Sequence, residues 1–284
     1  MKTVSIIIPT FNRANLVTRA IDSALRQSYP CEVIVCDHGS TDNTHEVVSV
    51  YGNTIKYIRR EIDNGPIVCW RDGLENSSGD IIHFNYDDDW MEPQFIEKTI
   101  EFMKDDVGFV YSRFFLHSLS NKMYIGNIHP SSINKMANIV KYLLHSSFTI
   151  SPSCAIFRRK DALKNLLLEI PGASGKYGKN SGVGEDLLLF LLTSLDYPKY
   201  GYVNEPLVHF LEHSESITIN SVISGHKREL QDSYDNAKKY YLAQPNSFSI
   251  SLSKTNRWLF KIFWNLKSGS LIKNALFFLK KDGF

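Results

Sequence analysis

Three consecutive carboxylates, Asp87, Asp88 and Asp89, are the residues of this chain best suited to chemistry. They follow the apolar run 81–84, which predicts a buried strand. Adjacent acids repel one another and cannot lie unpaired in a core. At the carboxyl edge of a parallel strand they would face the crevice in which open α/β sheets bind ligands. Taken alone, they fit a solvated acidic turn as well as a site for Mg²⁺ or Mn²⁺, cations that prefer hard oxygen ligands and also bind substrate phosphates.

A second pair of acids, Glu185 and Asp186, stands between a glycine-rich segment and an apolar run. The segment 172–184 holds five glycines and is either a mobile lid over a site or a flexible connection. Its place directly before the acid pair favours the lid. One of the two carboxylates could serve as a general base. Alternatively, both acids only complement the dipole at the start of a helix predicted at 187–195.

The elements that must position these acids follow from the pattern of apolar residues. The first hundred residues alternate strand and helix three times, with polar loops after the strands. This order predicts an α/β fold with a doubly wound parallel sheet and a nucleotide-type crevice at its carboxyl edge. Neither GxGxxG nor a Walker A motif occurs, so the sequence indicates neither a dinucleotide site nor an ATP loop. The strands are predicted at 4–8, 32–36, 55–58 and 81–84, with helices that include 16–25 and 67–75.

The second half of the chain is less regular, and its predicted elements are more widely spaced. Pro93 would lie early in a helix, where its missing N–H group costs nothing. The helices are predicted at 93–104, 137–145 and 160–168, and the strands at 107–115 and 153–158.

Composition excludes some classes of function. A formal net charge of +2 over 284 residues gives no general reason to expect nucleic-acid binding. The four cysteines have neither CxxC spacing nor zinc-ligand spacing with histidines, which is typical of reduced thiols in a cytoplasmic protein. The N-terminus leads straight into a strand, so we expect no signal peptide. No apolar run approaches the roughly 20 residues that span a bilayer.

Six short stretches, taken together and in order, resemble the family 2 glycosyltransferases, which are inverting enzymes of the GT-A fold. The resemblance covers roughly residues 3–220. One stretch, Val-Cys-Asp-His-Gly-Ser-Thr-Asp, is similar to the Asp-Asp-Gly-Ser loop of the family, and Asp87–Asp89 stands in place of its DxD motif. The stretches are residues 4–13, 35–42, 64–73, 87–89, 184–186 and 209–218.

The resemblance implies roles for the acids. Asp89 would hold Mn²⁺ or Mg²⁺, Asp87 would bind ribose or sugar hydroxyls, and Asp88 could serve either role or neither. Asp186 would be the base that takes the proton of the acceptor hydroxyl, with Glu185 as the alternative.

The resemblance also implies a nucleotide site. His213 would reach the metal or a phosphate, and Arg71 would meet the base or the phosphates. Without the family resemblance, Phe11 could equally be a core residue or a stacking platform. Arg71 could equally be a surface cation or a ligand of the nucleotide. The remaining residues expected to bind the nucleotide sugar are Pro9, Thr10, Phe11, Arg13, Asp37 and His38.

Two positions depart from the family pattern. His38 stands where a second Asp, which often contacts the imide of uracil, is usual; either Asp37 makes that contact or donor recognition is altered. Asp72 replaces the usual Asn, a change that could alter only a hydrogen bond in helix packing.

Residues 221–284 lie outside the resemblance and form a predicted C-terminal helical extension. Aromatic and basic residues alternate through 256–281, a composition that suits the surface of an anionic membrane. Alternatively, these helices pack on the catalytic domain or on a second subunit of a homodimer. The domain itself divides into a nucleotide-sugar half, 1–110, and an acceptor half, 111–220.

We therefore expect an inverting, metal-dependent glycosyltransferase, cytoplasmic or peripheral on the inner face of the cytoplasmic membrane. It would move a sugar from a nucleotide diphosphate sugar, with UDP as the expected nucleotide, to a glycan or lipid-linked acceptor in polysaccharide biosynthesis. A sugar-nucleotide nucleotidyltransferase is one alternative, although residues 9–12 lack the glycine-rich phosphate loop of that class. A non-catalytic protein that binds sugar nucleotides or glycans is the other, and it would need no base.

Overall fold

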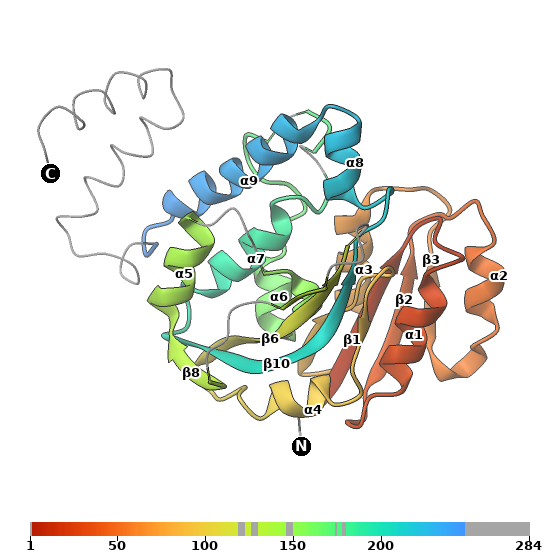
Figure 1. Ribbon diagram of the computed structural model, residues 1–284, viewed down its shortest axis with the longest axis horizontal. Coiled ribbons are helices and arrows are strands. Elements are labelled where there is room, and N and C mark those ends of the chain that lie inside the picture. Colours follow the sequence, from red (N-terminus) through yellow and green to blue (C-terminus); the bar gives the residue numbers. More distant parts are fainter. Residues whose placement is uncertain are drawn as a thin grey trace, which may run out of the picture.

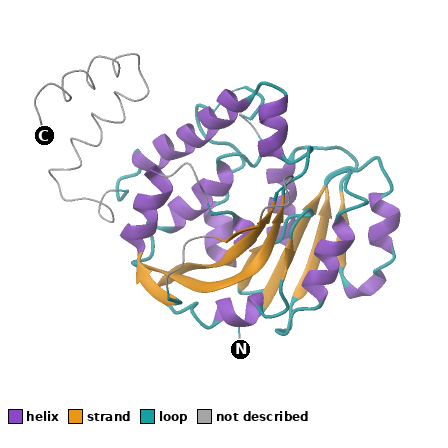
Figure 2. Ribbon diagram, viewed as in Figure 1, coloured by secondary structure: helices purple, strands orange, loops and turns teal. Residues whose placement is uncertain are grey.

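The computed structural model describes residues 2–118, 123–125, 130–145, 150–173, 175–177 and 180–247, of which 123–125 and 145 are described by backbone alone. The aromatic and basic segment 256–281 lies outside the described residues, so its predicted membrane or subunit contacts stay predictions. Helices surround one twisted sheet (Figures 1 and 2).

The strands are β1 (Val4–Thr10), β2 (Glu32–Asp37), β3 (Lys56–Arg59), β4 (Ile81–Phe84), β5 (Trp90–Met91), β6 (Val107–His117), β7 (Met123–Ile125), β8 (Ser132–Lys135), β9 (Ala155–Arg158) and β10 (Lys199–Leu211). The α-helices are α1 (Val17–Leu25), α2 (Thr44–Ser49), α3 (Pro66–Asn76), α4 (Phe95–Ile100), α5 (Met136–His145), α6 (Arg159–Asn165), α7 (Glu185–Thr193), α8 (Ile217–Ile223) and α9 (Lys227–Leu242). Two short 3-10 helices are η1 (Gly52–Thr54) and η2 (Pro152–Cys154).

The sheet runs in the order β3-β2-β1-β4-β9-β6-β10-β5, with β7 paired to β6 and β8 to β10. Strands β3, β2, β1 and β4 are parallel, as the alternating pattern predicts. Beyond β4 the sheet is mixed, because β9 runs antiparallel to both β4 and β6, whereas β10 is parallel to β6. The predicted α/β class and the GT-A-like arrangement of the nucleotide half are confirmed.

The sheet reverses its winding between β1 and β4. From β1 to β2 the chain moves toward the β3 edge of the sheet, and from β3 to β4 it crosses back to the other side of β1. Because parallel crossovers are right-handed, helices α1 and α3 must cover opposite faces. Helix α3 lies close on β1 because residue 73 is glycine: a Cβ there would lie 2.3 Å from Cγ2 of Ile7. In doubly wound sheets, ligands bind at such a reversal, which here lies at the carboxyl ends of β1 and β4.

Strand β10 is the main element that the sequence pattern did not predict. It runs beside β6 along its length, but its register shifts between Val203 and Pro206 and again between Pro206 and Val208. These register shifts interrupt the alternation that marks a strand. The predicted helix 93–104 is shorter than expected, since after Ile100 the chain continues in i→i+3 turns to Phe102 and Met103.

Helix α9 lies in the segment expected to be a C-terminal extension, yet it packs against α7 (Figure 1). Its Ala237 and Tyr241 are fully buried in the same hydrophobic core as β1 and α7. The division at residue 220 stays a prediction. Among the residues that the structure describes, no helix is both long and apolar enough to cross a bilayer.

Candidate active site

The predicted site residues gather where strands β1, β2 and β4 end. Thr10 closes β1, Asp37 closes β2, and Asp87 follows β4 after a short turn. Asn85 N donates to Ile7 O, which keeps the acid segment beside β1 as it leaves the sheet. The crevice at this edge is the place where doubly wound sheets bind nucleotides.

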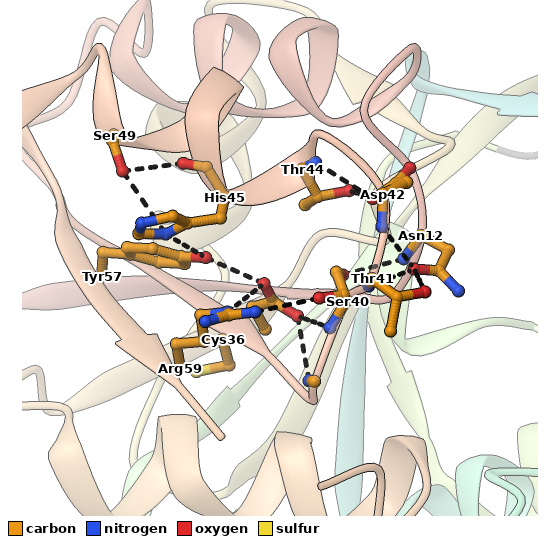
Figure 3. A network of polar contacts seen from close by, with 12 residues as sticks. Asn12, Cys36, Ser40, Thr41, Asp42, Thr44, His45, Ser49, Tyr57 and Arg59 are labelled. Carbon is orange, nitrogen blue, oxygen red and sulfur yellow. Dashed lines mark hydrogen bonds and ion pairs between the residues drawn. The ribbon is translucent and has the colours of Figure 1, made fainter. Parts of the chain in front are cut away.

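Two loops that leave β1 and β2 are joined by side-chain hydrogen bonds (Figure 3). Asn12 has a left-handed backbone (φ 54°), and its Oδ1 accepts from the N–H groups of Thr41 (2.8 Å) and Asp42 (3.3 Å). In return, Ser40 Oγ accepts from Asn12 N at 2.9 Å. Asparagine tolerates the left-handed region better than most residues, which suits it to this turn. The loops therefore form one preorganised surface.

Asp37 holds the second of these loops together. Its Oδ1 accepts from Gly39 N (3.0 Å) and Ser40 N (2.8 Å). Its Oδ2 accepts from the Tyr57 hydroxyl at 2.8 Å and lies 3.6 Å from Nε of Arg59. The Asp37 side chain is 0% exposed. A buried carboxylate with this set of partners serves the loop, so its geometry favours a structural role over the predicted contact with the base.

His38 follows Asp37 in this loop and is nearly buried, with 7% of its surface exposed. Its ring stacks on Phe11, with centroids 4.7 Å apart and an interplanar angle of 18°. Its Nδ1 lies 2.6 Å from Oδ1 of Asp63. A carboxylate accepts hydrogen bonds, so Nδ1 carries the proton in this contact, and in the neutral imidazole Nε2 is the acceptor. Asp63 thus sets the tautomer of His38, a contact that the sequence analysis did not foresee.

Arg71 has partners that contradict its predicted contact with the base or the phosphates. Its guanidinium donates to the carbonyl of Leu163 at 2.7 Å and to that of Leu166. Both acceptors lie at the end of α6, where carbonyl groups lack partners within the helix. Arg71 therefore joins α3 to α6. Asp72, the second departure from the family pattern, forms an ion pair with Arg60.

The three consecutive acids have distinct surroundings. Nε of Arg13 lies 4.0 Å from Oδ1 of Asp87, and Nε2 of His213 lies 3.1 Å from Oδ2 of Asp88. Burial and the charge of Asp88 raise the pKa of Asp87 to about 7, although Arg13 acts in the opposite direction. Burial, and then Asp88, also raise the pKa of Asp89, which is 5% exposed. A cation bound here would relieve this repulsion.

The carboxylates of Asp87, Asp88 and Asp89 are the hard oxygen ligands that Mg²⁺ and Mn²⁺ prefer. Within the described residues, no group of three or more His, Cys, Asp or Glu side chains is arranged to hold a metal ion. His213 contacts Asp88 rather than forming such a group with Asp89. Mg²⁺ commonly takes one or two carboxylates and fills its remaining positions with water and substrate phosphates. The donor chemistry fits a metal shared with the substrate, and the assignment of Asp89 and His213 stays a prediction.

Two further residues support this edge of the site. Nη2 of Arg19 donates to the carbonyl of Asp88 at 2.9 Å, and its guanidinium lies 3.8 Å above the ring of Trp90. Glu215 forms an ion pair with Arg13 and so ties the segment after β10 to the nucleotide loops. Arg19 could have been suspected from sequence, because it is a cation within an otherwise apolar helical pattern. Glu215 offered no such signal.

Glu185 and Asp186 open helix α7 but differ in access. The Glu185 side chain is 1% exposed, neither of its carboxylate oxygens has a partner among the described residues, and burial raises its pKa to about 8. Asp186 is partly exposed. Its Oδ1 accepts from Gly184 N (2.9 Å) and Leu187 N (2.7 Å), and its Oδ2 from the Tyr234 hydroxyl (3.1 Å). Burial raises the pKa of Asp186 to about 6, against the effect of these hydrogen bonds.

Tyr86 connects the two groups of acids. It stands two residues before Asp88, and its ring lies 5.3 Å from that of Trp70 on α3. Burial raises the pKa of the Tyr86 hydroxyl, and the negative charges of Asp186 and Asp89 raise it further. Both acids therefore lie near one tyrosine, although 97 residues separate them in the chain.

A family model described as glycosyl transferase family 2 matches residues 5–166. Among curated proteins, the chain is 31% identical over 136 residues to the glycosyltransferase GlyA of Streptococcus pneumoniae, which is 43% of this chain and 19% of that protein. It is 40% identical over 106 residues to the chondroitin synthase of Pasteurella multocida, 36% of this chain and 11% of the synthase. The chain thus spans about a fifth or less of the length of these relatives.

Solved structures show the same fold. The chain resembles residues 1–349 of TarS from S. aureus, in a crystal structure with UDP-GlcNAc, with a TM-score of 0.61 and 16% sequence identity. The match covers 90% of this chain and 77% of that one.

Proposed function

The chain belongs to glycosyl transferase family 2, and on that premise we propose that it transfers a sugar from a UDP-sugar to an acceptor hydroxyl with inversion at the anomeric carbon. The observation that carries this proposal is the presence of two acid groups, one after β4 and one at the start of α7, whose charges both raise the pKa of the Tyr86 hydroxyl. One group, at the carboxyl end of β4, suits a diphosphate and its cation, and the other contains a partly exposed carboxylate at the start of α7. Nucleotide binding alone would not need the second.

Recognition of the base is assigned to His38. Asp37 is buried and its carboxylate is occupied by the loop. His38 carries its proton on Nδ1 toward Asp63, so Nε2 can accept the N3–H of uracil. A histidine held in this tautomer offers the same acceptor as the Asp that is usual at this position. The complex of TarS with UDP-GlcNAc supports uridine as the nucleoside to test first.

Binding of the diphosphate is assigned to the three consecutive acids, Asp87 to Asp89, and to the cationic side chains beside them. Asp89 and His213, which contacts the adjacent Asp88, would hold Mg²⁺ or Mn²⁺, and Arg13 lies beside Asp87 where it can face the ribose or a phosphate. A divalent cation bound here supplies charge neutralisation for the diphosphate leaving group. The chain itself orients the donor, because the two loops joined through Asn12 are preorganised.

Proton transfer is assigned to Asp186. The acceptor oxygen forms a bond to the anomeric carbon, the bond from that carbon to the diphosphate oxygen breaks, and the acceptor proton passes to the Asp186 carboxylate. UDP leaves with the bonding electrons. Asp186 is ionised above pH about 6, whereas Glu185, with its pKa raised to about 8, is largely neutral at pH 7. A base must be ionised and accessible, and of the two residues Asp186 meets both requirements.

The acceptor class is a glycan or a lipid-linked glycan in polysaccharide biosynthesis. Similarity to a chondroitin synthase and a hyaluronan synthase of Pasteurella multocida supports a glycan acceptor. Attachment of residues 256–281 to the inner face of the membrane would place the site beside a lipid-linked acceptor. The nucleotidyltransferase and the non-catalytic binder remain the alternatives against which the proposal is tested.

The test is a screen of UDP-, GDP- and dTDP-sugars with Mn²⁺ or Mg²⁺, in which release of the nucleotide diphosphate is measured with and without oligosaccharide acceptors. We expect turnover of a UDP-sugar that increases with acceptor, and its loss in Asp186→Asn. Release of pyrophosphate from a nucleoside triphosphate and a sugar phosphate would instead identify a nucleotidyltransferase. Tight UDP-sugar binding with neither reaction would identify a binding protein.

A further inference from the structure

Three side chains on neighbouring turns of helix α9 make hydrogen bonds near the start of α7, two of them to the glycine-rich segment and one to Asp186. Oε2 of Glu229 accepts from the N–H of Lys176 at 2.8 Å. One turn further along, the Ser233 hydroxyl donates to the carbonyl of Tyr177 at 2.7 Å. The adjacent Tyr234 donates to Oδ2 of Asp186 at 3.1 Å. The described part of the segment is therefore fastened to α9, whereas the sequence favoured a mobile lid.

The close approach of α9 depends on Gly184. This residue has φ +94° and caps the N-terminus of α7. A Cβ at position 184 would lie 2.9 Å from the carbonyl oxygen of Ser233, closer than side-chain carbons come to backbone oxygens. The chain thus has room for α9 only because glycine precedes the acid pair. The same contact brings the neighbouring Tyr234 to Asp186.

The hydrogen bonds of Asp186 divide between its two oxygens. Oδ1 is occupied by the N–H groups of Gly184 and Leu187, both at the start of α7. Oδ2 accepts from Tyr234 and keeps its second lone pair. We propose that Tyr234 is a positioning residue of the transfer reaction: its hydroxyl holds Oδ2 of Asp186 so that the remaining lone pair faces the acceptor hydroxyl. The inference rests on the proposed function, in which Asp186 is the base.

This assignment makes the C-terminal part of the chain a component of the catalytic machinery. Tyr234 lies well beyond residues 5–166, the part that matches the family model. It also lies in the segment that the sequence separated from the catalytic domain as an extension. The Tyr234 side chain is partly buried, and its own pKa is raised first by burial and then by the charge of Asp186. Tyr234 therefore stays protonated and can donate throughout the working pH range.

The proposal predicts a specific change in pH dependence. A hydrogen bond to the ionised form of a carboxylate lowers its pKa, so removal of the Tyr234 hydroxyl should raise that of Asp186. The groups that face Asp186 are Glu185 on its own helix, Tyr86 from the acid segment and Tyr234 from α9. Of these, Tyr234 is the one with a hydrogen bond to the Asp186 carboxylate.

The experiment compares Tyr234→Phe with Tyr241→Phe in the full-length protein. Tyr241 lies on the same helix and is fully buried, but its hydroxyl donates to the carbonyl of Ser247. For Tyr234→Phe we expect the acid limb of the kcat/KM profile to move up by about 1 pH unit and kcat on the plateau to fall by about 10-fold, with donor Kd unchanged. Tyr241→Phe should leave the acid limb in place. An unchanged profile for Tyr234→Phe, or an equal shift in both variants, would overturn the positioning role.

A third variant separates this inference from the proposed function. If Asp186→Asn retains transfer, Asp186 is not the base and the proposed mechanism fails. If Asp186→Asn is inactive while Tyr234→Phe keeps the wild-type pH profile, the mechanism stands and the role of Tyr234 is wrong. Thermal unfolding of each variant shows whether a loss of activity comes from a loss of fold.

Discussion

Nδ1 of His38 lies 2.6 Å from Oδ1 of Asp63, and this pair occupies the position where the family usually presents an acidic side chain. In the neutral imidazole, this contact leaves Nε2 as the hydrogen-bond acceptor. His38 is also stacked on Phe11, so its plane is fixed on one side by an aromatic ring and on its edge by a carboxylate.

Replacement of His38 tests the base contact. We expect His38→Ala to weaken UDP binding by about 10-fold, because a buried imide loses its acceptor. His38→Asp should retain more affinity, since a carboxylate can accept the same N–H group. Calorimetry with UDP and GDP measures both effects. Equal UDP affinity in the wild type and His38→Ala would show that the base is recognised elsewhere.

Replacement of Asp89 tests the metal assignment. Asp89→Ala should abolish the increase in UDP affinity that Mn²⁺ produces, while the fold stays intact. The control is Asp105→Ala, which changes an acid beside Lys2, near the opposite edge of the sheet. Titration of UDP with and without Mn²⁺ gives the result. If Mn²⁺ increases UDP affinity equally in Asp89→Ala and the wild type, Asp89 is not a ligand.

The buried Glu185 predicts that stability falls as pH rises. Its folded-state pKa is raised from 4.5 to about 8, so between these values the folded protein binds more protons than the unfolded chain. The free energy of unfolding must then decrease from pH 4.5 toward pH 8. Glu185→Gln removes this titration, and we expect it to lose less stability than the wild type between pH 6 and pH 9. Urea unfolding of both proteins at pH 6 and at pH 9 measures the difference. Parallel losses in the two proteins would mean that Glu185 is ionised in the fold.

Arg71 is expected to affect stability and not donor binding. Arg71→Met removes hydrogen bonds to the carbonyls of Leu163 and Leu166 but keeps a long side chain. Loss of these charged hydrogen bonds should cost about 1–3 kcal/mol of unfolding free energy. The affinity for UDP should stay within about twofold of the wild type. A 10-fold loss of UDP affinity with unchanged stability would restore the role that the sequence predicted.

The sequence alone determined the features that depend on residues adjacent in the chain. An apolar run followed by polar residues marks a buried strand and its end, and this pattern located β1, β2 and β4 with the acids that follow β4. Because parallel strands finish at one edge, strand ends imply that Thr10, His38 and Asp87 lie near one another before any coordinates are known. The alternation also determined the parallel half of the sheet.

Tertiary structure alone decided the partners of these residues. Whether Asp37 faces a ligand or its own loop, and whether Arg71 meets a phosphate or the end of α6, depends on which groups from other segments pack beside each residue. Register shifts concealed β10, because they interrupt the alternation that a strand shows in sequence. Tyr234 reaches Asp186 from 48 residues away, through a helix whose polar face resembles any solvated surface. Periodicity reports which face of an element is buried, whereas hydrogen bonds between elements depend on packing, which no local pattern contains.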